Sequence, residues 1–404
     1  MPQPTPTATP ILKPPVGRLY FLWDSQPLNQ DNVRDASYQL FLARSLENSG
    51  EWYIEPMLND LIGFPDTALS PDQTKLALTY IIDFNGDGHA SQESVNRGFD
   101  GYLLGVYDLV SQHFTPLNPS QANPYNLDWL ADNETIIFRV SQDILTHHIS
   151  NQPSQKLIPS PSDRTQFLSV SANKQVAMLR LTSGQNLFID TSTGEIIFTT
   201  EGLEQVAWSP NNQWLATVKS ETKEVMLLNA QTFETLPLQT LNSVEWLAWS
   251  PDSQTLAVIQ SNDVQATLQF LTVADFAFQE ILTVQGKMNR LNRSIDPQFG
   301  FSWAPDSSQL ALAVQQEGVI SLTLIDQQTK ASHPIWQSGD HKRLHKFTWS
   351  PDSQWLAFIA GQAAFYHYEE EEAGLYVIHK SGGGLQQVQG TATSADPWVV
   401  FWLP

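Results

Sequence analysis

The residues with the clearest chemical pattern are oxygen-bearing side chains at alternate positions. Asp83, Asn85 and Asp87 can each direct a carboxylate or amide oxygen at one hard cation, and His89 can add its backbone carbonyl. Gly88 stands where a calcium-binding loop must turn sharply. The spacing therefore predicts a calcium ion, with a structural role because nothing nearby suggests a reaction.

The last ligand of this loop is less well defined. The twelfth position, where a bidentate glutamate completes such loops, is Ser94. Glu93 stands one place earlier, and Asp100 is an alternative. Strand-like runs flank the segment, which excludes a complete helix–loop–helix hand. A glycine-rich acidic turn without an ion remains the other interpretation.

Two further segments carry side chains suited to a ligand. One holds an aromatic and acidic patch that fits a sugar, a cation or a basic partner: Tyr366, His367, Tyr368 and Glu369. An acidic run of this kind is also common in solvated loops. The other segment is the one locally basic insertion, with Arg290 and Arg293, which can pair with the acidic loops or with an anionic ligand.

No catalytic motif is present. The chain lacks the nucleophile elbow, the zinc-protease helix, the phosphate-binding loop and the dinucleotide fingerprint. His147 and His148 are neighbours in a predicted strand, so their rings should face opposite sides and not share a metal. A pair of carboxylates acting on a glycosidic bond stays possible, because spacing in sequence does not show which of them face each other.

Composition restricts the partners. The 404 residues carry 42 Asp and Glu against 21 Lys and Arg, a net charge of −21. Such a chain repels phosphate backbones, so we expect no nucleic-acid partner. The absence of cysteine excludes disulfides and thiol catalysis. No apolar run is long enough to span a membrane, and we expect a monomer.

The elements that position these groups form a repeat. In the clearest copy, Phe347–Trp349 leads into Ser350-Pro351-Asp352, and Trp355–Ile359 follows. Pro fixes φ as a turn requires, and Asp can hydrogen-bond to the backbone that follows it, so the unit is strand, tight turn, strand. More strand-like runs follow each unit, and four strands per repeat are typical of a β-propeller blade.

The Trp-Ser-Pro-Asp pattern resembles the WD40-like PD40 repeat of TolB-like β-propellers, over nearly the whole chain after the first fifteen or so residues. The resemblance implies an all-β propeller of four-stranded antiparallel blades. It leaves function open, because such propellers serve as binding modules, assembly factors and enzyme domains.

The number of copies predicts eight blades, or seven if the weak unit at Val170 belongs to a neighbour. The residues at the Trp position are Leu69, Trp129, Val170, Trp208, Trp249, Trp303, Trp349 and Trp402. The last unit is split between the chain ends, so we expect Trp402–Pro404 and Leu19–Trp23 to close the ring within one blade.

The long insertions are expected on one rim of the disc. Residues 24–37, 83–100 and 361–373 should connect the second and third strands of their blades, and residues 286–297 should connect two blades. Long segments on one face of a rigid scaffold commonly carry function. The register also suggests an acidic channel mouth on this rim, formed by Asp66, Asp128, Glu204, Glu245, His345 and Asp396.

The first fifteen residues, 1–15, form a Pro/Thr-rich tract that we expect to be a disordered tether, with a single propeller domain at 16–404. Such tracts often follow a removed signal or a lipid-bearing residue, so we expect an exported protein, with a cytosolic one as the alternative.

These features favour a non-enzymatic binding module for a protein or glycan, with calcium ordering one loop. The main alternative is a propeller enzyme, a polysaccharide lyase or hydrolase acting at the channel mouth. A regulatory propeller from a larger peptidase is disfavoured by the closed ends.

Overall fold

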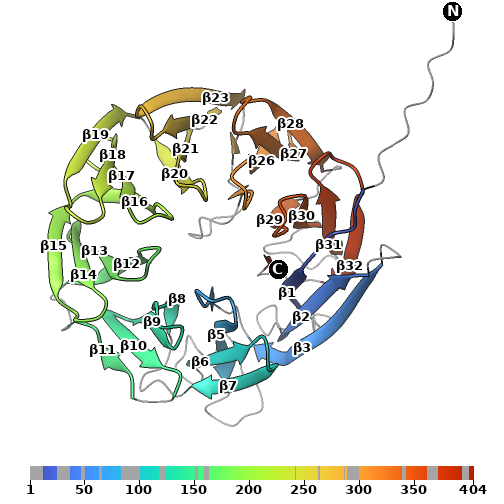
Figure 1. Cartoon of the computed structure of the whole chain (residues 1–404), viewed down its shortest axis with the longest axis horizontal. Coiled ribbons are helices and arrows are strands. Elements are labelled where there is room, and N and C mark those ends of the chain that lie inside the picture. Colours follow the sequence, from blue (N-terminus) through green and yellow to red (C-terminus); the bar gives the residue numbers. More distant parts are fainter. Residues whose placement is uncertain are drawn as a thin grey trace, which may run out of the picture.

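The computed structural model describes most of the chain, in these ranges: 12–24, 37–46, 51–62, 66–82, 101–117, 124–150, 153–158, 163–241, 243–262, 264–285, 287–288, 300–338, 343–361, 372–393 and 400–404. All regular elements within them are strands, arranged as eight antiparallel sheets around a central axis (Figure 1). This confirms the eight-bladed β-propeller, and the weak unit at Val170 forms a blade of its own. No helix in the described ranges is long and apolar enough to cross a membrane.

We number the blades along the chain and give their strands from the axis outward. Blade 1 contains β4 (Thr67–Leu69), β5 (Lys75–Ile82), β6 (Gly101–Asp108) and β7 (His113–Leu117). Blade 2 contains β8 (Tyr125–Trp129), β9 (Thr135–Val140), β10 (Asp143–His148) and β11 (Gln155–Lys156). Blade 3 contains β12 (Thr165–Val170), β13 (Val176–Leu181), β14 (Gln185–Asp190) and β15 (Ile196–Glu201). Blade 4 contains β16 (Leu203–Trp208), β17 (Trp214–Lys219), β18 (Glu224–Asn229) and β19 (Thr235–Thr240).

The second half of the ring follows the same plan, with one interrupted inner strand. Blade 5 contains β20 (Val244–Trp249), β21 (Thr255–Ser261), β22 (Gln265–Thr272) and β23 (Ala277–Gln285). Blade 6 contains β24 (Lys287–Met288) and β25 (Phe301–Trp303), both beside β26 (Gln309–Gln316), then β27 (Val319–Asp326) and β28 (Ser332–Gln337). Blade 7 contains β29 (Arg343–Trp349), β30 (Trp355–Gly361), β31 (Glu372–His379) and β32 (Gln386–Thr393). Blade 8 contains β33 (Val400–Leu403), β1 (Arg18–Asp24), β2 (Ser37–Ser45) and β3 (Trp52–Ile62).

The Ser-Pro-Asp turn is held by its own side chains. In blade 7, Ser350 Oγ donates to Asp352 Oδ1 at 2.6 Å and accepts the backbone N–H of Trp355 at 2.9 Å. Ser353 takes a positive φ of 58°, and its N–H donates to the Ser350 carbonyl. The turn residues thus satisfy the backbone groups that reversing the chain leaves unpaired.

The same turns connect neighbouring blades. The backbone N–H of the Asp or Asn residue in one turn donates to the hydroxyl of the positive-φ serine in the next turn. Asn211 donates to Ser253 and Asp252 donates to Ser307, both at 3.0 Å. The indole N–H at the repeat's Trp position donates likewise to the preceding blade, as from Trp249 to the Ala207 carbonyl at 2.9 Å. Repeats that contain these residues therefore bond directly to a neighbouring blade.

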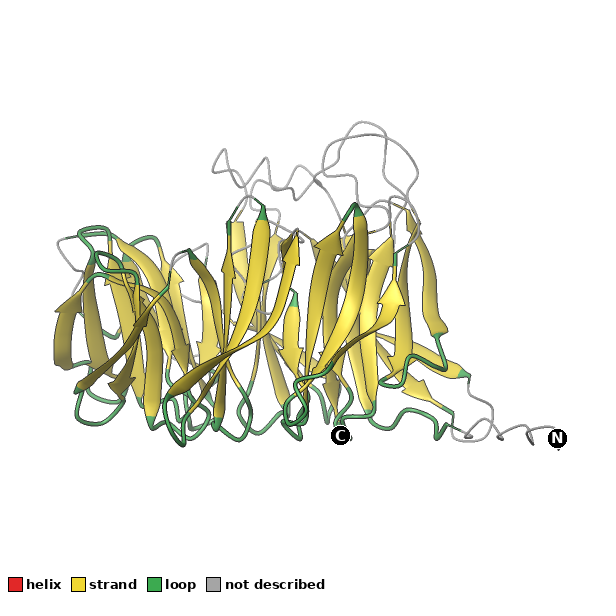
Figure 2. Ribbon diagram, turned by 90° about the horizontal axis from the view of Figure 1, so that it is seen from above, coloured by secondary structure: helices red, strands yellow, loops and turns green. Residues whose placement is uncertain are grey.

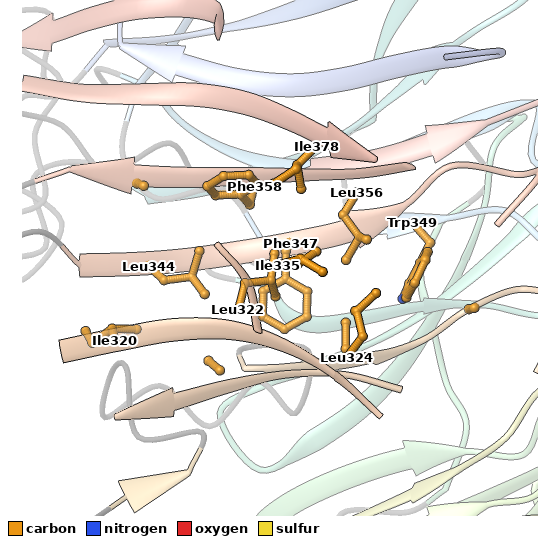
Figure 3. Packing of buried hydrophobic residues seen from close by; sticks show 14 residues of the cluster. Ile320, Leu322, Leu324, Ile335, Leu344, Phe347, Trp349, Leu356, Phe358 and Ile378 are labelled. Atoms are coloured by element: carbon orange, nitrogen blue, oxygen red, sulfur yellow. The ribbon is translucent and has the colours of Figure 1, made fainter. Parts of the chain in front are cut away.

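The hydrophobic core is divided among the interfaces between blades. Figure 3 shows the cluster between blades 6 and 7, where Leu322 and Leu324 of β27 face Phe347 of β29 and Leu356 of β30. All four side chains are almost fully buried. Stability thus depends on each blade having two neighbours, so the ring must close.

Closure takes place in blade 8, as the split unit predicts. Leu403 pairs with Arg18 and Val400 with Phe21, so the last strand of the chain lies on the inner side of β1. Gly17 precedes β1 with φ +94°, and a Cβ on it would lie 2.4 Å from the Leu403 carbonyl oxygen. Glycine is required here because no other residue fits both the backbone angle and the close approach.

The disc has two different rims (Figure 2). The short-turn rim carries the turn between the first and second strands of each blade and the turn between its third and fourth strands. The opposite rim, which we call the long-segment rim, is where the second strand of each blade ends and the third begins. Residues 25–36, 83–100 and 362–371 join such strand ends in blades 8, 1 and 7, and they lie outside the described residues.

Candidate functional site

The residues expected to bind calcium or a ligand all fall in the segments that join strands at the long-segment rim. They lie outside the described residues: Asp83, Asn85, Asp87, His89, Glu93, Arg290, Arg293, Tyr366, His367, Tyr368 and Glu369. Within the described ranges, no group of three or more His, Asp or Glu residues could hold a metal ion. The predicted calcium site therefore stays a prediction.

The described strands fix where these segments begin and end. Ile82 pairs with Gly101 in blade 1, Gly361 with Ala373 in blade 7, and Asp24 with Tyr38 in blade 8. Each segment thus starts and finishes on paired strands at the long-segment rim, in three consecutive blades. In blades 2 to 6 the corresponding strands are joined by only a few residues, such as Ser141-Gln142.

The basic insertion has a different attachment from the one expected. Lys287 and Met288 already pair with Gln315 and Val314 of β26, and Phe301 pairs with Leu312 of the same strand. Residues 289–299 thus interrupt the inner strand of blade 6, and they do not form the expected connection between blades 5 and 6. Both ends of the insertion lie on the strand nearest the channel.

The inner strands are irregular where they begin at the long-segment rim. Extra residues break the pairing between the first two strands in five blades, at Asn126–Leu127, Gln166, Glu204–Gln205, Glu245 and His345–Lys346. Bulges of this kind redirect side chains and are common beside binding sites. These irregular strand starts lie on the same rim as the long segments.

Three residues of the expected acidic mouth already have partners in the structure. Glu204 is paired with Lys223 (Oε1–Nζ 2.7 Å). Asp128 lies next to Trp129, towards the short-turn rim, and is paired with Lys174 at 2.8 Å. Asp66 accepts the backbone N–H of Leu127. Asp396 is outside the described residues. The acidic mouth was expected from strand register alone, which does not reveal these cationic partners.

The structure adds two arginines that the sequence interpretation missed. Arg139 of β9 pairs with Tyr125, lies over its ring at 4.4 Å, and donates from Nη2 to the Tyr125 hydroxyl at 2.8 Å. Arg180 of β13 pairs with Phe167 in the same way, 5.2 Å from the ring centroid. Both occupy the fifth position of the second strand in consecutive blades, so alignment of the repeats could have found them.

The surroundings of Arg180 extend into blade 4. Its Nη1 donates to the backbone carbonyls of Glu204 at 2.6 Å and Leu203 at 3.2 Å, at the bulge of β16. Burial lowers the pKa of the guanidinium, and the nearby Glu204 carboxylate partly offsets this effect. The Glu204 carboxylate itself is held by Lys223.

His147 and His148 contact different side chains. His147 is 1% exposed, and its Nδ1 lies 3.0 Å from Ser154 Oγ. His148 is on the other face, where Nδ1 contacts Ser150 and Nε2 lies 3.1 Å from a Glu134 carboxylate oxygen. The rings face opposite sides, as strand geometry predicts.

Comparison with known proteins relates this chain to others by fold. No family model matches it, and no curated protein matches it. Among solved structures, oligogalacturonate lyase from Vibrio parahaemolyticus is similar with a TM-score of 0.52 and 11% identity, over 80% of this chain and 93% of that one. A protein assigned as a 6-phosphogluconolactonase from Bacteroides uniformis has a TM-score of 0.50 and 11% identity, over 96% of this chain and all of that one (100%).

A TolB from Agrobacterium tumefaciens is also similar, with a TM-score of 0.37 and 11% identity over 59% of this chain and 84% of that one. Identities this low are informative about architecture only. The chain is therefore an eight-bladed β-propeller, and oligogalacturonate lyase is among the solved structures similar to it in fold.

Proposed function

We propose that the protein is an exported, non-enzymatic binding module that holds a protein or glycan ligand on the long-segment rim. The difference between the rims supports this proposal. The short-turn rim is occupied by tight, internally hydrogen-bonded turns, whereas three consecutive blades send long segments from the other rim and a fourth sends one from beside the channel. Long segments on a rigid scaffold commonly carry binding function.

The course of the described N-terminal residues fits this orientation. Leu12 packs beside Trp355, and a Cβ on Gly384 would lie 2.9 Å from Leu12 Cδ1. Both partners lie at the short-turn rim of blade 7. A tether formed by the Pro/Thr-rich tract would therefore leave from the rim opposite the proposed ligand face, which would point away from the anchor.

Trimming the long segments tests the ligand face. Residues 25–36 and 362–371 are each replaced by a short Gly-Asn turn, which suits the paired strands that flank them. We expect binding to the best ligand from a glycan and peptide array to be lost, while the melting temperature stays near that of the parent. Surface plasmon resonance and differential scanning fluorimetry provide the two readouts.

The matched control changes Gln231 and Thr232, in an exposed turn of the short-turn rim. It should leave binding intact. Unchanged binding in the trimmed, folded protein would reject the proposed face. Shortening of the ligand during incubation would instead assign the alternative, a polysaccharide lyase or hydrolase.

Calcium is the proposed ion of the segment 83–94. A calcium titration followed by thermal unfolding should raise the melting temperature, because a ligand that binds only the native state stabilises it by about 2.7 kcal/mol at a hundredfold excess over Kd. The double variant Asp83→Asn and Asp87→Asn should lose this response, and magnesium should not reproduce it. Absence of any rise at millimolar calcium in the parent protein would disprove the ion site.

A further inference from the structure

The outermost strand of each blade has one edge that faces away from the disc. In blade 3 this strand is β15, which pairs with β14 regularly from Phe198 to Glu201, with one bulge before that stretch. No described strand pairs with its outer edge (Figure 1). Such an edge presents unpaired backbone groups that can pair with another chain, and proteins commonly block it with proline or a charged side chain.

One repeat position of the outer strand carries such a blocking residue in six blades. This position, which we call the blocking position, lies opposite the residue three places before the end of the third strand. In blade 3 the third strand ends at Asp190, so the residue is Leu187 and the blocking position is Thr199. In blade 7 it is Gln387. The other six blades have proline or a charged residue there: Glu55, Pro116, Lys156, Pro237, Glu280 and Pro334.

Blade 3 also differs from blade 7 in the side chains of its outer strand. Ile196 and Ile197 of β15 are 54% and 43% exposed, whereas Val388 of β32 is 8% exposed. Every residue of β15 before its final glutamate is β-branched or aromatic, the types that fit a strand best. Blade 3 therefore combines an edge without a blocking residue and apolar side chains that a partner strand could cover.

The backbone of β15 is held with its free groups directed outward. The N–H of Gly202 donates to the Gly184 carbonyl at 2.9 Å, towards β14. Backbone groups of an antiparallel strand alternate between its two sides, so those of Thr199, three places earlier, face away from β14. Phe198 anchors the strand by stacking on Phe233 of blade 4, with 4.6 Å between the ring centroids. The outer edge is therefore rigid before any partner arrives.

We propose that the outer edge of β15 binds an extended peptide segment with basic ends, which joins blade 3 as a fifth strand. Glu195 and Glu201 flank the apolar stretch and are exposed, so a cation at each end of the peptide meets an opposite charge. The net charge of −21 also attracts a basic segment over a distance. A second copy of this chain is disfavoured, because two β15 strands paired antiparallel about Phe198 would place Glu195 opposite Glu201 at both ends. This edge is on the circumference of the disc and is independent of the ligand face proposed above.

Fluorescence anisotropy with the full chain tests the edge, at constant ionic strength. The probe is a labelled, amidated peptide, Lys-Val-Thr-Val-Thr-Lys, and a second peptide of equal charge has proline in place of both valines, so that it lacks strand-forming N–H groups. We expect saturable binding of the first peptide and binding weaker by about tenfold or more for the second. Thr199→Pro removes the outward N–H and should cause a similar loss. Gln387→Pro changes the same repeat position in blade 7 and is the matched control, which should bind normally.

Thr199→Pro should keep the melting temperature of the parent, because three other blades accommodate proline at the blocking position. If it does not fold, Thr199→Lys, which gives blade 3 the residue type of blade 2, replaces it with the same expected loss of affinity. The loop-trimmed protein should bind the peptide as the parent does, which separates this test from that of the ligand face.

Three results would overturn the proposal. One is the absence of saturable binding to the parent, and another is equal affinity of the parent and Thr199→Pro. Equal affinity for a peptide with glutamate at both ends would overturn the choice of a basic segment. A dimer of the parent that Thr199→Pro converts to a monomer in analytical ultracentrifugation would assign the edge to a second copy instead.

Discussion

Deletion of Val400–Pro404 is expected to prevent the ring from closing. These residues include β33, the inner strand of blade 8, and they carry Trp402 and Leu403, which are 7% and 3% exposed. Their loss removes apolar contacts with both neighbouring blades, together with the ladder to β1. Removal of a buried Trp or Leu side chain costs about 2–5 kcal/mol each, so we expect a loss of roughly 5–10 kcal/mol. This is comparable with the whole stability of a typical domain.

The truncated protein should therefore be recovered as aggregates or as an unfolded chain. Without β33, the inner edge of β1 presents unpaired backbone groups to other molecules. Size-exclusion chromatography and urea unfolding measure the effect. Deletion of Pro404 alone is the control, since it removes an exposed residue whose carbonyl accepts one hydrogen bond from Arg18. A monomeric truncated protein with the parent's urea midpoint would show that the ring does not depend on this closure.

The architecture was predictable because the repeat is encoded locally. Each copy contains a turn whose Ser and Asp side chains bond within the same few residues, as Ser350 and Asp352 do, so a short stretch of sequence specifies the hairpin. Even the weak copy at Ser171 keeps this pattern, with Asn173 accepting from the Ser171 hydroxyl at 2.8 Å. The split unit predicted closure because a half-repeat at each end can only be completed by the other.

Features that depend on the next blade were not predictable in this way. The serine after Asp reads as an ordinary turn residue, yet Ser253 accepts a hydrogen bond from Asn211, 42 positions earlier in the chain. Asp128 was placed at the channel mouth, but Lys174 of the next blade binds it at the other end of the strand. Periodicity describes each strand alone, whereas these contacts depend on how the blades stack.

The interrupted strand of blade 6 shows a second limit. Lys287–Met288 is too short to be recognised as a strand, and only the backbone of β26 shows that it continues the line of Phe301–Trp303. The two stacked arginines were missed for a similar reason: Arg139 and Arg180 each look like one charge in an apolar run. Their common position becomes clear only when β9 and β13 are superimposed as repeats.

Replacement of Trp129 by alanine should be the most destabilising single substitution considered for the repeat. Trp129 is fully buried between blades 1 and 2, against Ala77 and Leu104. Its indole N–H donates to the Ala68 carbonyl of blade 1 at 2.8 Å. The truncation leaves a large cavity, so we expect a loss of about 3–5 kcal/mol. Trp129→Phe keeps most of the apolar contact and should cost about 1–2 kcal/mol, since mainly the hydrogen bond is lost.

Urea unfolding measures these losses, and hydrogen exchange locates them, with the largest loss of protection expected in β4 and β8. Trp208→Ala provides a matched control, because this side chain is partly exposed and donates to the Ser169 hydroxyl at 3.2 Å. It should be less destabilising than Trp129→Ala. The fold itself should persist in both variants, since Leu69 and Val170 occupy the same position in blades that form without an indole. Equal losses for Trp129→Ala and Trp208→Ala would mean that burial between blades does not set the contribution of this position.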